Sequence, residues 1–272
     1  MIKISIRTVK MVADYSLQSI KASDIIGQLH NKLVRHNIMD IIDSIDRYYK
    51  KKGIHSLQFT CCHKHECSLN SRNFTGPKST FVPDKYSESY PRIAFLSLDS
   101  GDSLSDPKER TPHAVRRQEQ IACVVEELPK GLHWYETHYW AQQVYNAISS
   151  NHITLEETKN YFCHLNSAKC CQNKRHSKEA DSILFQNCRQ YLPEELKLIS
   201  PHILISQGNR AREAITEIFT IKDKLYENVY LISPDKFLWV HTYHPGSRDY
   251  YRNQKKDLDN IARVLRDSIS YV

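Results

Sequence analysis

The sequence contains no run of about eighteen apolar residues, an absence that argues against a membrane-spanning helix. Residues 1–7 also lack the apolar stretch and small-residue cleavage site of a secretory signal. We therefore expect a cytoplasmic protein with no membrane partner. No internal repeat is present, and 272 residues suffice for one large domain with an extension.

Disulfides are not expected in a reducing compartment, so clustered cysteines among the eight indicate metal ligands or small buried side chains. Cys123 and Cys163 lie among apolar neighbours and fit the second interpretation. The formal net charge of +7, with fourteen histidines, favours a polyanionic partner.

Residues 1–55 carry apolar side chains at three- and four-residue steps, which predicts an N-terminal helical extension. Residues 56–272 form the expected main domain. Its first part, residues 56–90, is rich in Ser, Asn, Pro, Thr and Lys and predicts a long loop. A loop of this length is usually either disordered or held in place by other contacts, and its cysteines suggest that metal ligation holds this one.

Four continuous apolar runs predict buried strands, and amphipathic patterns between and after them predict helices. The strands are expected at 92–98, 161–165, 202–206 and 237–242, and the helices at 113–128, 136–149, 178–199, 209–217 and 256–269. This alternation predicts an α/β fold of three layers (α/β/α), with a central four-stranded parallel sheet.

Ligands of open α/β sheets bind beyond the carboxyl ends of the strands. The polar segments that follow the four runs are 99–102, 166–169, 207–209 and 243–247. We expect the functional side chains to lie on these segments.

Four cysteines can converge if the 56–90 loop folds beside the later segments: Cys62, Cys67, Cys170 and Cys188. Four thiolates suit either a tetrahedral zinc ion, the commoner structural metal, or a four-iron cluster. Cys61 and Cys171 are adjacent alternatives within each group.

The region from Asn166 onward resembles the iron–sulfur branch of the uracil-DNA glycosylase superfamily. The resemblance lies in an Asn-x-x-Lys-Cys sequence, a second cysteine one helix later and a Pro-containing strand that ends in glycine: Asn166, Lys169, Cys170, Cys188, Pro201 and Gly208. It implies that the four cysteines hold a structural 4Fe-4S cluster in place of zinc. It also implies that DNA is the partner.

Asp99 falls where the resemblance implies a water-activating aspartate, and Ser100 and Gly101 in the same turn are implied to border the base. A carboxylate there can orient a water and stabilise an oxocarbenium-like sugar. The alternative is that Asp99-Ser-Gly is an ordinary turn. His244, in His244-Pro-Gly-Ser, falls where the resemblance implies a histidine that stabilises the departing base. A lone histidine can also be structural.

Asn166 offers an amide donor and acceptor for a pyrimidine edge, although asparagine is also a common turn or cap residue. The resemblance implies that His113 stacks on the flipped base; an exposed residue at a helix start is the alternative. The residues implied to contact DNA are Lys169, Arg248, Tyr250, Tyr251 and Arg252. For the last four, the alternative is the start of a surface helix.

We therefore expect a monofunctional, monomeric DNA glycosylase that flips a pyrimidine nucleotide and hydrolyses its N-glycosidic bond. The departures from the uracil pattern favour a modified pyrimidine, for example a bulky modified cytosine of phage DNA excised in antiviral defence. Excision of uracil in repair is one alternative. Another alternative is a non-catalytic nucleic-acid-binding protein whose fold is held together by a metal site. The last is an α/β hydrolase whose fold is held together by zinc.

Overall fold

The computed structural model describes residues 41–69, 71, 73–101, 106–173, 180–234 and 236–272. Residues 1–40, which carry the first expected helix, lie outside this part of the chain. In the described residues, no helix has both the length and the apolar character needed to cross a membrane.

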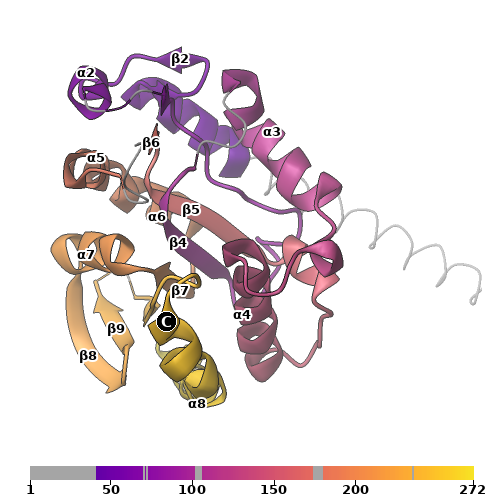
Figure 1. The fold of residues 1–272 in the computed structure, drawn as a ribbon. Helices are drawn as coiled ribbons and strands as arrows, with labels where there is room; N and C mark the ends of the chain where they lie inside the picture. Colours follow the sequence, from indigo (N-terminus) through magenta and orange to yellow (C-terminus); the bar gives the residue numbers. More distant parts are fainter. Residues whose placement is uncertain (1–40, 70, 72, 102–105, 174–179, 235) are drawn as a thin grey trace, which may run out of the picture.

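A six-stranded sheet runs through the centre of the fold in the order β5-β4-β7-β10-β9-β8 (Figure 1). Its strands are β4 (Ile93–Asp99), β5 (Phe162–Ala168), β7 (Ile203–Gln207), β8 (Thr220–Tyr226), β9 (Val229–Ser233) and β10 (Leu238–Thr242). The first four in this order are mutually parallel, which confirms the predicted four-stranded parallel sheet. The antiparallel hairpin β8–β9 was not predicted, because β8 is exposed along most of its length and has no continuous apolar run.

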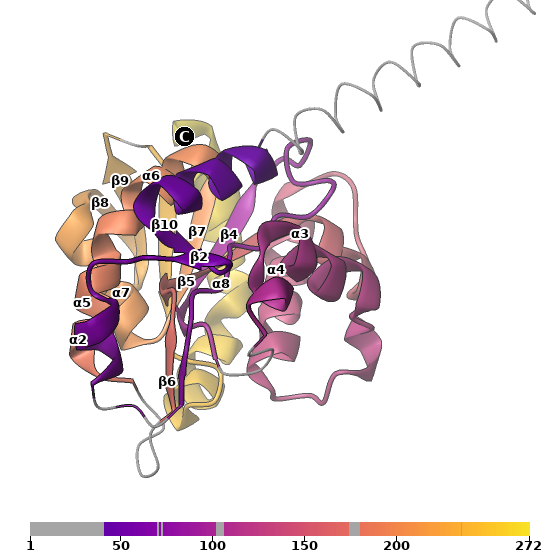
Figure 2. The same ribbon diagram turned by 90° about the horizontal axis from the view of Figure 1, so that it is seen from above.

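Helices cover both faces of the sheet, each over its own apolar core (Figure 2). On one face lie the helical residues 41–52 with α5 (Ser182–Cys188), α6 (Leu192–Ile199) and α7 (Asn209–Ile218). On the other face lie α3 (Pro112–Arg116), α4 (His133–Ile148) and α8 (Lys255–Ser268). The three-layer α/β/α prediction is therefore confirmed.

The helix of residues 41–52 packs directly on the main domain. Ile42, Ile45 and Tyr49 are buried in the same core as α5, α6 and α7. The helix ends at Gly53, whose φ of +67° is a conformation that favours glycine. The predicted boundary at residue 55 thus divides elements that share one core, and the rest of the predicted extension is outside the described residues.

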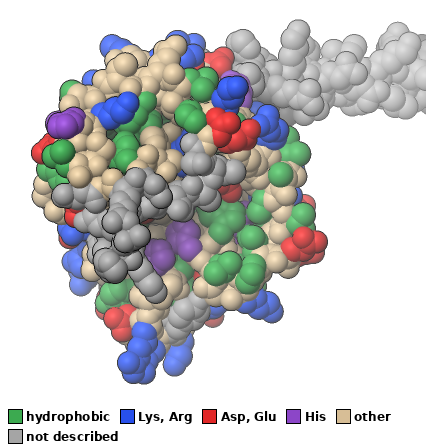
Figure 3. All heavy atoms as spheres, turned by 45° about the horizontal axis from the view of Figure 1, so that its top comes forward, with side chains coloured by type: hydrophobic (Ala, Val, Ile, Leu, Met, Phe, Trp, Pro, Cys, Tyr) green, Lys and Arg blue, Asp and Glu red, His purple; other side chains and the backbone are tan. Residues whose placement is uncertain are grey.

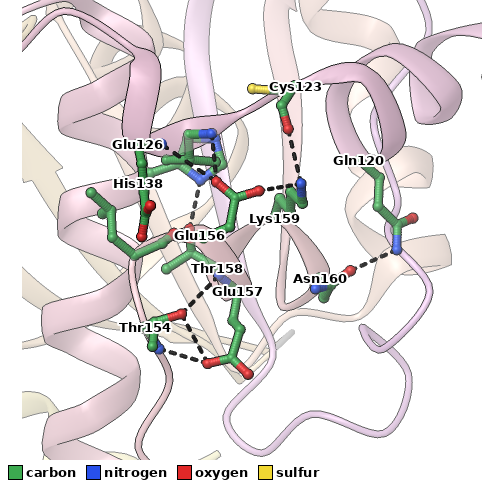
Figure 4. Close-up of polar contacts among 12 residues, drawn as sticks. Gln120, Cys123, Glu126, His138, Thr154, Glu156, Glu157, Thr158, Lys159 and Asn160 are labelled. Atoms are coloured by element: carbon green, nitrogen blue, oxygen red, sulfur yellow. Dashed lines mark hydrogen bonds and ion pairs between the residues drawn. The ribbon is translucent and has the colours of Figure 1, made fainter.

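The predicted helix over 113–128 is broken into α3, a π-helical turn η2 (Arg117–Ala122) and a 3-10 turn η3 (Val125–Glu127). Side chains of η4 (Glu156–Asn160) form hydrogen bonds with backbone groups that a continuous helix would pair within itself (Figure 4). Lys159 Nζ donates to the Cys123 carbonyl, and the Glu156 carboxylate accepts from the amides of Val125 and Glu126.

The predicted loop of residues 56–90 contains short elements that tie it to later parts of the chain. Strand β3 (Asn73–Thr75) pairs with β6 (Cys171–Asn173), with Thr75 opposite Cys171, and Phe81 forms a bridge with His164. The remaining short elements of the fold are β1 (Ile54–His55), β2 (Gln58–Phe59), α2 (Lys64–Ser68), η1 (Pro107–Arg110), η5 (Arg189–Tyr191), η6 (Tyr250–Gln254) and η7 (Ile269–Tyr271).

The strand register brings the carboxyl ends of the parallel strands to one edge. Ser97 pairs with Asn166 across β4 and β5, and Thr242 pairs with Gln207 across β10 and β7. Gly208 follows at a φ of +91°, where an added Cβ would lie 3.0 Å from a methyl group of Leu98. This close approach leaves no room for a side chain between the strand ends.

Candidate active site

A pocket of about 650 Å³ opens at this edge of the sheet. It is lined by five of the six residues that the sequence assigned to water activation, leaving-group stabilisation and base binding: Asp99, Ser100, Gly101, Asn166 and His244. Histidine side chains lie together on this face of the molecule in Figure 3. The fold thus brings residues from β4, β5 and the segment after β10 into one site.

Asp99 is the last residue of β4, and His244 lies two residues beyond the end of β10. Burial lowers the pKa of His244, and the nearby negative charge of Asp99 acts in the opposite direction. The carboxylate and the imidazole therefore interact across the pocket, and His244 is neutral at neutral pH.

The hydrogen bonds of His244 identify which ring nitrogen carries the proton. The amide of Gly246 donates to His244 Nδ1 at 3.1 Å, and the amide of Ser247 donates to the His244 carbonyl at 2.8 Å. Because Nδ1 accepts a hydrogen bond, the neutral ring carries its proton on Nε2. The free donor of this imidazole is therefore Nε2–H.

A second layer of hydrogen bonds centres on Gln207, the last residue of β7. Gln207 Nε2 donates to the Thr137 hydroxyl at 3.0 Å, which leaves Gln207 Oε1 as an acceptor for the Ser97 hydroxyl at 2.7 Å and for His133 Nε2 at 2.9 Å. His164 Nε2 lies 2.8 Å from the Ser97 oxygen and donates to it. Both histidines are therefore neutral Nε2–H tautomers in a network whose donors and acceptors all match.

This network fixes a ring against the proposed catalytic histidine. His133 stacks on His244 with ring centroids 5.1 Å apart and an interplanar angle of 16°. Burial and the neighbouring His244 lower the pKa of His133 to about 4, and burial holds the pKa of His164 well below its usual value. The stack is consequently uncharged at neutral pH.

Sequence reasoning did not find His133, Trp134 or His164 as pocket residues. Trp134 lies edge-on to His164, with ring centroids 4.9 Å apart, and both line the pocket. His133 and Trp134 come from the first turn of α4, and His164 from the middle of β5. None follows a strand end, which was the only available signal.

A buried guanidinium group lies beneath the turn that follows β4. Arg110 is 1% exposed and donates to the Ser100 hydroxyl and, at 3.3 Å, to the Gly101 carbonyl. These bonds fix the backbone next to Asp99. A surface location would have been the ordinary expectation for an arginine.

The structure contradicts the prediction that His113 stacks on the base. His113 is the second residue of α3. Its side chain is 56% exposed, and its ring lies 4.0 Å from Asp43, away from the residues that line the pocket. The interpretation as an exposed residue at a helix start is therefore correct. The sequence between Gly101 and α3 contains too little apolar or motif pattern to predict where His113 lies.

Lys169 is not a surface contact for DNA either. Its side chain is 1% exposed, and its Nζ lies 2.5 Å from Glu195 Oε2 and donates to the Asn166 carbonyl at 2.8 Å. The same carboxyl group of Glu195 accepts hydrogen bonds from Tyr49 and Thr80. Lys169 thus supports the strand end that carries Asn166.

The residues of the predicted DNA-contacting loop after β10 differ in their exposure to solvent. Arg248 and Arg252 are exposed. Tyr250 is completely buried. Its hydroxyl accepts a hydrogen bond from Trp140 Nε1 at 2.8 Å and donates one to Glu136 at 2.9 Å. Tyr250 therefore cannot contact DNA. The side chain of Tyr251 lies outside the described part of the chain.

Four cysteines gather just beyond the carboxyl end of β5, and one of them differs from the predicted set. Cys67, Cys170 and Cys188 are buried together with the partly buried Cys61, whereas Cys62 is exposed. The Cys170 thiol is surrounded by Cys188, Cys61 and Cys67, whose effects add to burial in raising its pKa. Cys61 therefore replaces Cys62 in the group.

Polar groups surround these sulfur atoms. The Lys169 amide donates to Cys188 Sγ at 3.4 Å, Asn187 Nδ2 donates to Cys67 Sγ at 3.5 Å, and the Tyr191 hydroxyl lies 3.4 Å from Cys61 Sγ. Within the described ranges, no three Cys, His, Asp or Glu side chains converge closely enough to hold a single metal ion. These N–H and O–H donors suit thiolates.

Comparison with protein families identifies the class to which this fold and pocket belong. The sequence model of the uracil DNA glycosylase superfamily matches residues 117–267, more than half of the chain. The chain therefore belongs to the uracil DNA glycosylase superfamily, whose members are DNA N-glycosylases. No curated protein matches the sequence. The matched region contains Asn166 and His244, and Asp99 precedes it.

Proposed function

We propose that this DNA glycosylase hydrolyses the N-glycosidic bond of a flipped, modified pyrimidine and acts as a monomer. The observation that carries the proposal is the convergence of Asp99, Asn166 and His244 in one pocket at the carboxyl edge of the sheet. All of these groups come from a single chain. Flipping is required because the bond is inaccessible within stacked DNA.

Each of these three residues has a separate role in the proposed reaction. Asp99 orients the attacking water and stabilises positive charge on the sugar. The Nε2–H of His244 donates to a carbonyl oxygen of the base as negative charge develops there, so that the base departs as a stabilised anion. The amide of Asn166 binds the edge of the base.

The dimensions and lining of the pocket support a substrate larger than uracil. A volume of about 650 Å³ falls in the range that holds drug-sized ligands, well above a bare pyrimidine ring. Lys78 and Glu119 form an ion pair of 3.0 Å in the pocket wall and supply a donor and an acceptor for a polar substituent. A bulky modified cytosine, such as occurs in phage DNA, fits these features, and antiviral defence is the role that this substrate suggests.

A panel of DNA duplexes tests the substrate. We expect wild-type protein to produce abasic sites from DNA with a bulky modified cytosine, and little product from DNA with uracil or cytosine. Alkaline cleavage and mass spectrometry of the released base measure this. Preferential release of uracil would establish the repair alternative, and no release from any duplex would leave a DNA-binding protein without catalysis.

We further propose that Cys61, Cys67, Cys170 and Cys188 hold a 4Fe-4S cluster. Such a cluster is held by four cysteine thiolates, and Cys170 is close enough to Cys188, Cys61 and Cys67 for their charges to raise its pKa beyond the effect of burial. The surrounding N–H and O–H donors would stabilise the thiolates. The role is structural, because these residues join the early loop to β6 and α5.

The adjacent pair Cys61 and Cys62 provides a matched test of this cluster. We expect Cys61→Ser to lose the iron and sulfide of anaerobically purified protein, and to lower the free energy of unfolding by about 3 kcal/mol, because a structural metal centre is lost. Cys62→Ser should retain both metal and stability, because Cys62 is exposed. Equal effects of the two substitutions, or a colourless wild type with one zinc per chain, would refute the assignment.

A further inference from the structure

A second pocket, of about 280 Å³, lies at the amino ends of the parallel strands, on the edge of the sheet opposite the candidate active site. Arg92, His202 and Phe237 line it, and they directly precede β4, β7 and β10. These strands are neighbours and their first residues are in register, so the three residues lie side by side. The other walls come mainly from α6 and from Phe219, which follows α7. We call this cavity the amino-edge pocket.

Three cationic side chains line the amino-edge pocket: Arg92, Lys197 and Lys236. No acidic side chain is among the described residues that line it. Within the described part of the chain, none of the three cations forms an ion pair with a carboxylate. The pocket therefore carries a positive charge that its own walls do not compensate.

Arg92 and His202 are fixed in place and still offer hydrogen-bond donors. Arg92 Nε donates to the Ser200 carbonyl at 2.7 Å, and the Arg92 amide donates to His202 Nδ1 at 2.9 Å. Burial and the positive charge of Arg92 lower the pKa of His202 to about 4, so its ring is neutral at neutral pH and carries its proton on Nε2. The terminal nitrogens of Arg92 and the His202 Nε2–H have no acceptor among the residues that the structure describes.

The end of α6 does not by itself explain these charges. A cation near a helix C-terminus stabilises free carbonyl groups, and the bond from Arg92 to Ser200 has this effect. That bond uses only Nε, and Lys236 lies on a different segment, before β10. Ser200 and Lys236 also have φ angles of 44° and 45°, which are unfavourable for residues with a Cβ and occur often at ligand sites. The arrangement is therefore that of a binding site.

We propose that the amino-edge pocket binds a small organic phosphate that carries a flat apolar ring, a class that includes mononucleotides. A phosphate monoester presents three terminal oxygens and up to two negative charges, which match several N–H donors and three cations better than a carboxylate does. The inference is independent of the proposed function, because this pocket shares no lining residue with the candidate active site.

The apolar part of the wall suits the ring of such a ligand. Leu196 is buried beneath the pocket, and the half-buried ring of Phe219 packs edge-on against Phe237, with ring centroids 5.3 Å apart. A further aromatic ring can pack against these side chains. The volume of about 280 Å³ lies near the lower limit for ligand pockets, which agrees with a ligand of mononucleotide size.

Isothermal titration calorimetry of the full chain with phenyl phosphate tests the site. We expect the double substitution Lys197→Gln, Lys236→Gln to weaken binding about tenfold, because two charge-assisted contacts are lost. The pair Lys51→Gln, Lys52→Gln removes the same charge from exposed positions on the helix of residues 41–52 and should bind as wild type. Equal weakening in the two variants would show a response to net charge alone and would overturn the site.

Related ligands test the chemical class. Inorganic phosphate lacks the ring and benzoate lacks the phosphate, so each should bind about tenfold more weakly than phenyl phosphate. Equal binding of either one would overturn the assignment of an organic phosphate. Tighter binding of thymidine 5′-monophosphate than of phenyl phosphate would support a mononucleotide as the ligand, and the reverse order would support an aryl phosphate without a nucleoside.

Duplex DNA shows which of the two pockets the ligand occupies. A duplex with a tetrahydrofuran abasic-site analogue should not displace phenyl phosphate, because the candidate active site opens at the opposite edge of the sheet. Displacement by the duplex would place the ligand at the active site and overturn the proposal. Absence of phenyl phosphate binding by wild-type protein would also overturn it, and neither result would change the proposed excision of a base.

Discussion

Replacement of Asp99 by Asn is expected to lower the single-turnover rate of base excision about a hundredfold or more, a loss of about 3 kcal/mol of transition-state stabilisation. The amide cannot take a proton from water, and it no longer supplies the negative charge that favours an oxocarbenium-like sugar. Rapid-quench measurements on the best duplex of the panel give the rate. Asp99 is the strand-end residue of β4, so the substitution leaves its backbone pairing with β5 intact.

DNA binding is the control for this variant. Phosphate contacts supply most of the affinity, so Asp99→Asn should bind at least as tightly as wild type, and removal of a negative charge that faces DNA should favour binding. Full excision by Asp99→Asn would show that another group activates the water. A parallel loss of binding and excision would show that the substitution disturbs the fold.

Replacement of His244 by Ala should also reduce single-turnover excision about a hundredfold, because a hydrogen bond aimed at developing charge is lost. Glutamine offers an N–H donor of similar reach, so His244→Gln should recover part of the rate. This partial rescue would not follow if the imidazole served only to pack against His133. Equal rates for the Ala and Gln variants would therefore contradict the donor role.

The pH profile gives a second test of His244. Burial lowers its pKa, so as the pH falls the neutral ring persists below 6.5, the usual pKa of a histidine. If the neutral Nε2–H is the donor, excision should stay level through that range. The stack should fail only as His133 protonates, at a pH of about 4. A wild-type rate that rises or falls with a midpoint near 6.5 would contradict a neutral donor.

The parallel sheet and the main site residues were predictable because they depend on local pattern. Continuous apolar runs locate β4, β5, β7 and β10, and parallel pairing then brings their carboxyl ends together. That rule locates the segments that carry Asp99 and His244, and the family resemblance implied the role of each residue. Among the positions that failed, Lys169 depends on a distant partner in Glu195, and Tyr250 on Glu136 and Trp140. The sequence around a lysine or a tyrosine does not show which distant residue will pair with its side chain in the interior.

Pocket residues from inside elements were equally hidden. His164 lies within β5, and its neighbours alternate between the two faces of the sheet, so its direction depends on register. His133 and Trp134 enter the pocket because α4 begins beside it, and that position is set by the packing of α4 on α8. Cys61 and Cys62 are adjacent and chemically identical, and only the path of the loop decides which one is buried.

The buried pair of Lys169 and Glu195 makes the early helix and the pocket one cooperative unit. Tyr49 bonds to the carboxylate of Glu195, Lys169 neutralises that carboxylate, and the ammonium group of Lys169 bonds to the carbonyl of Asn166. Loss of the Tyr49 hydrogen bond would leave the buried carboxylate short of a donor, which costs about 1–3 kcal/mol, a sizeable part of the stability of a domain. Local opening at residue 49 is thereby coupled to the strand that carries Asn166, and we expect a truncation within the helix to disturb a pocket formed more than a hundred residues later.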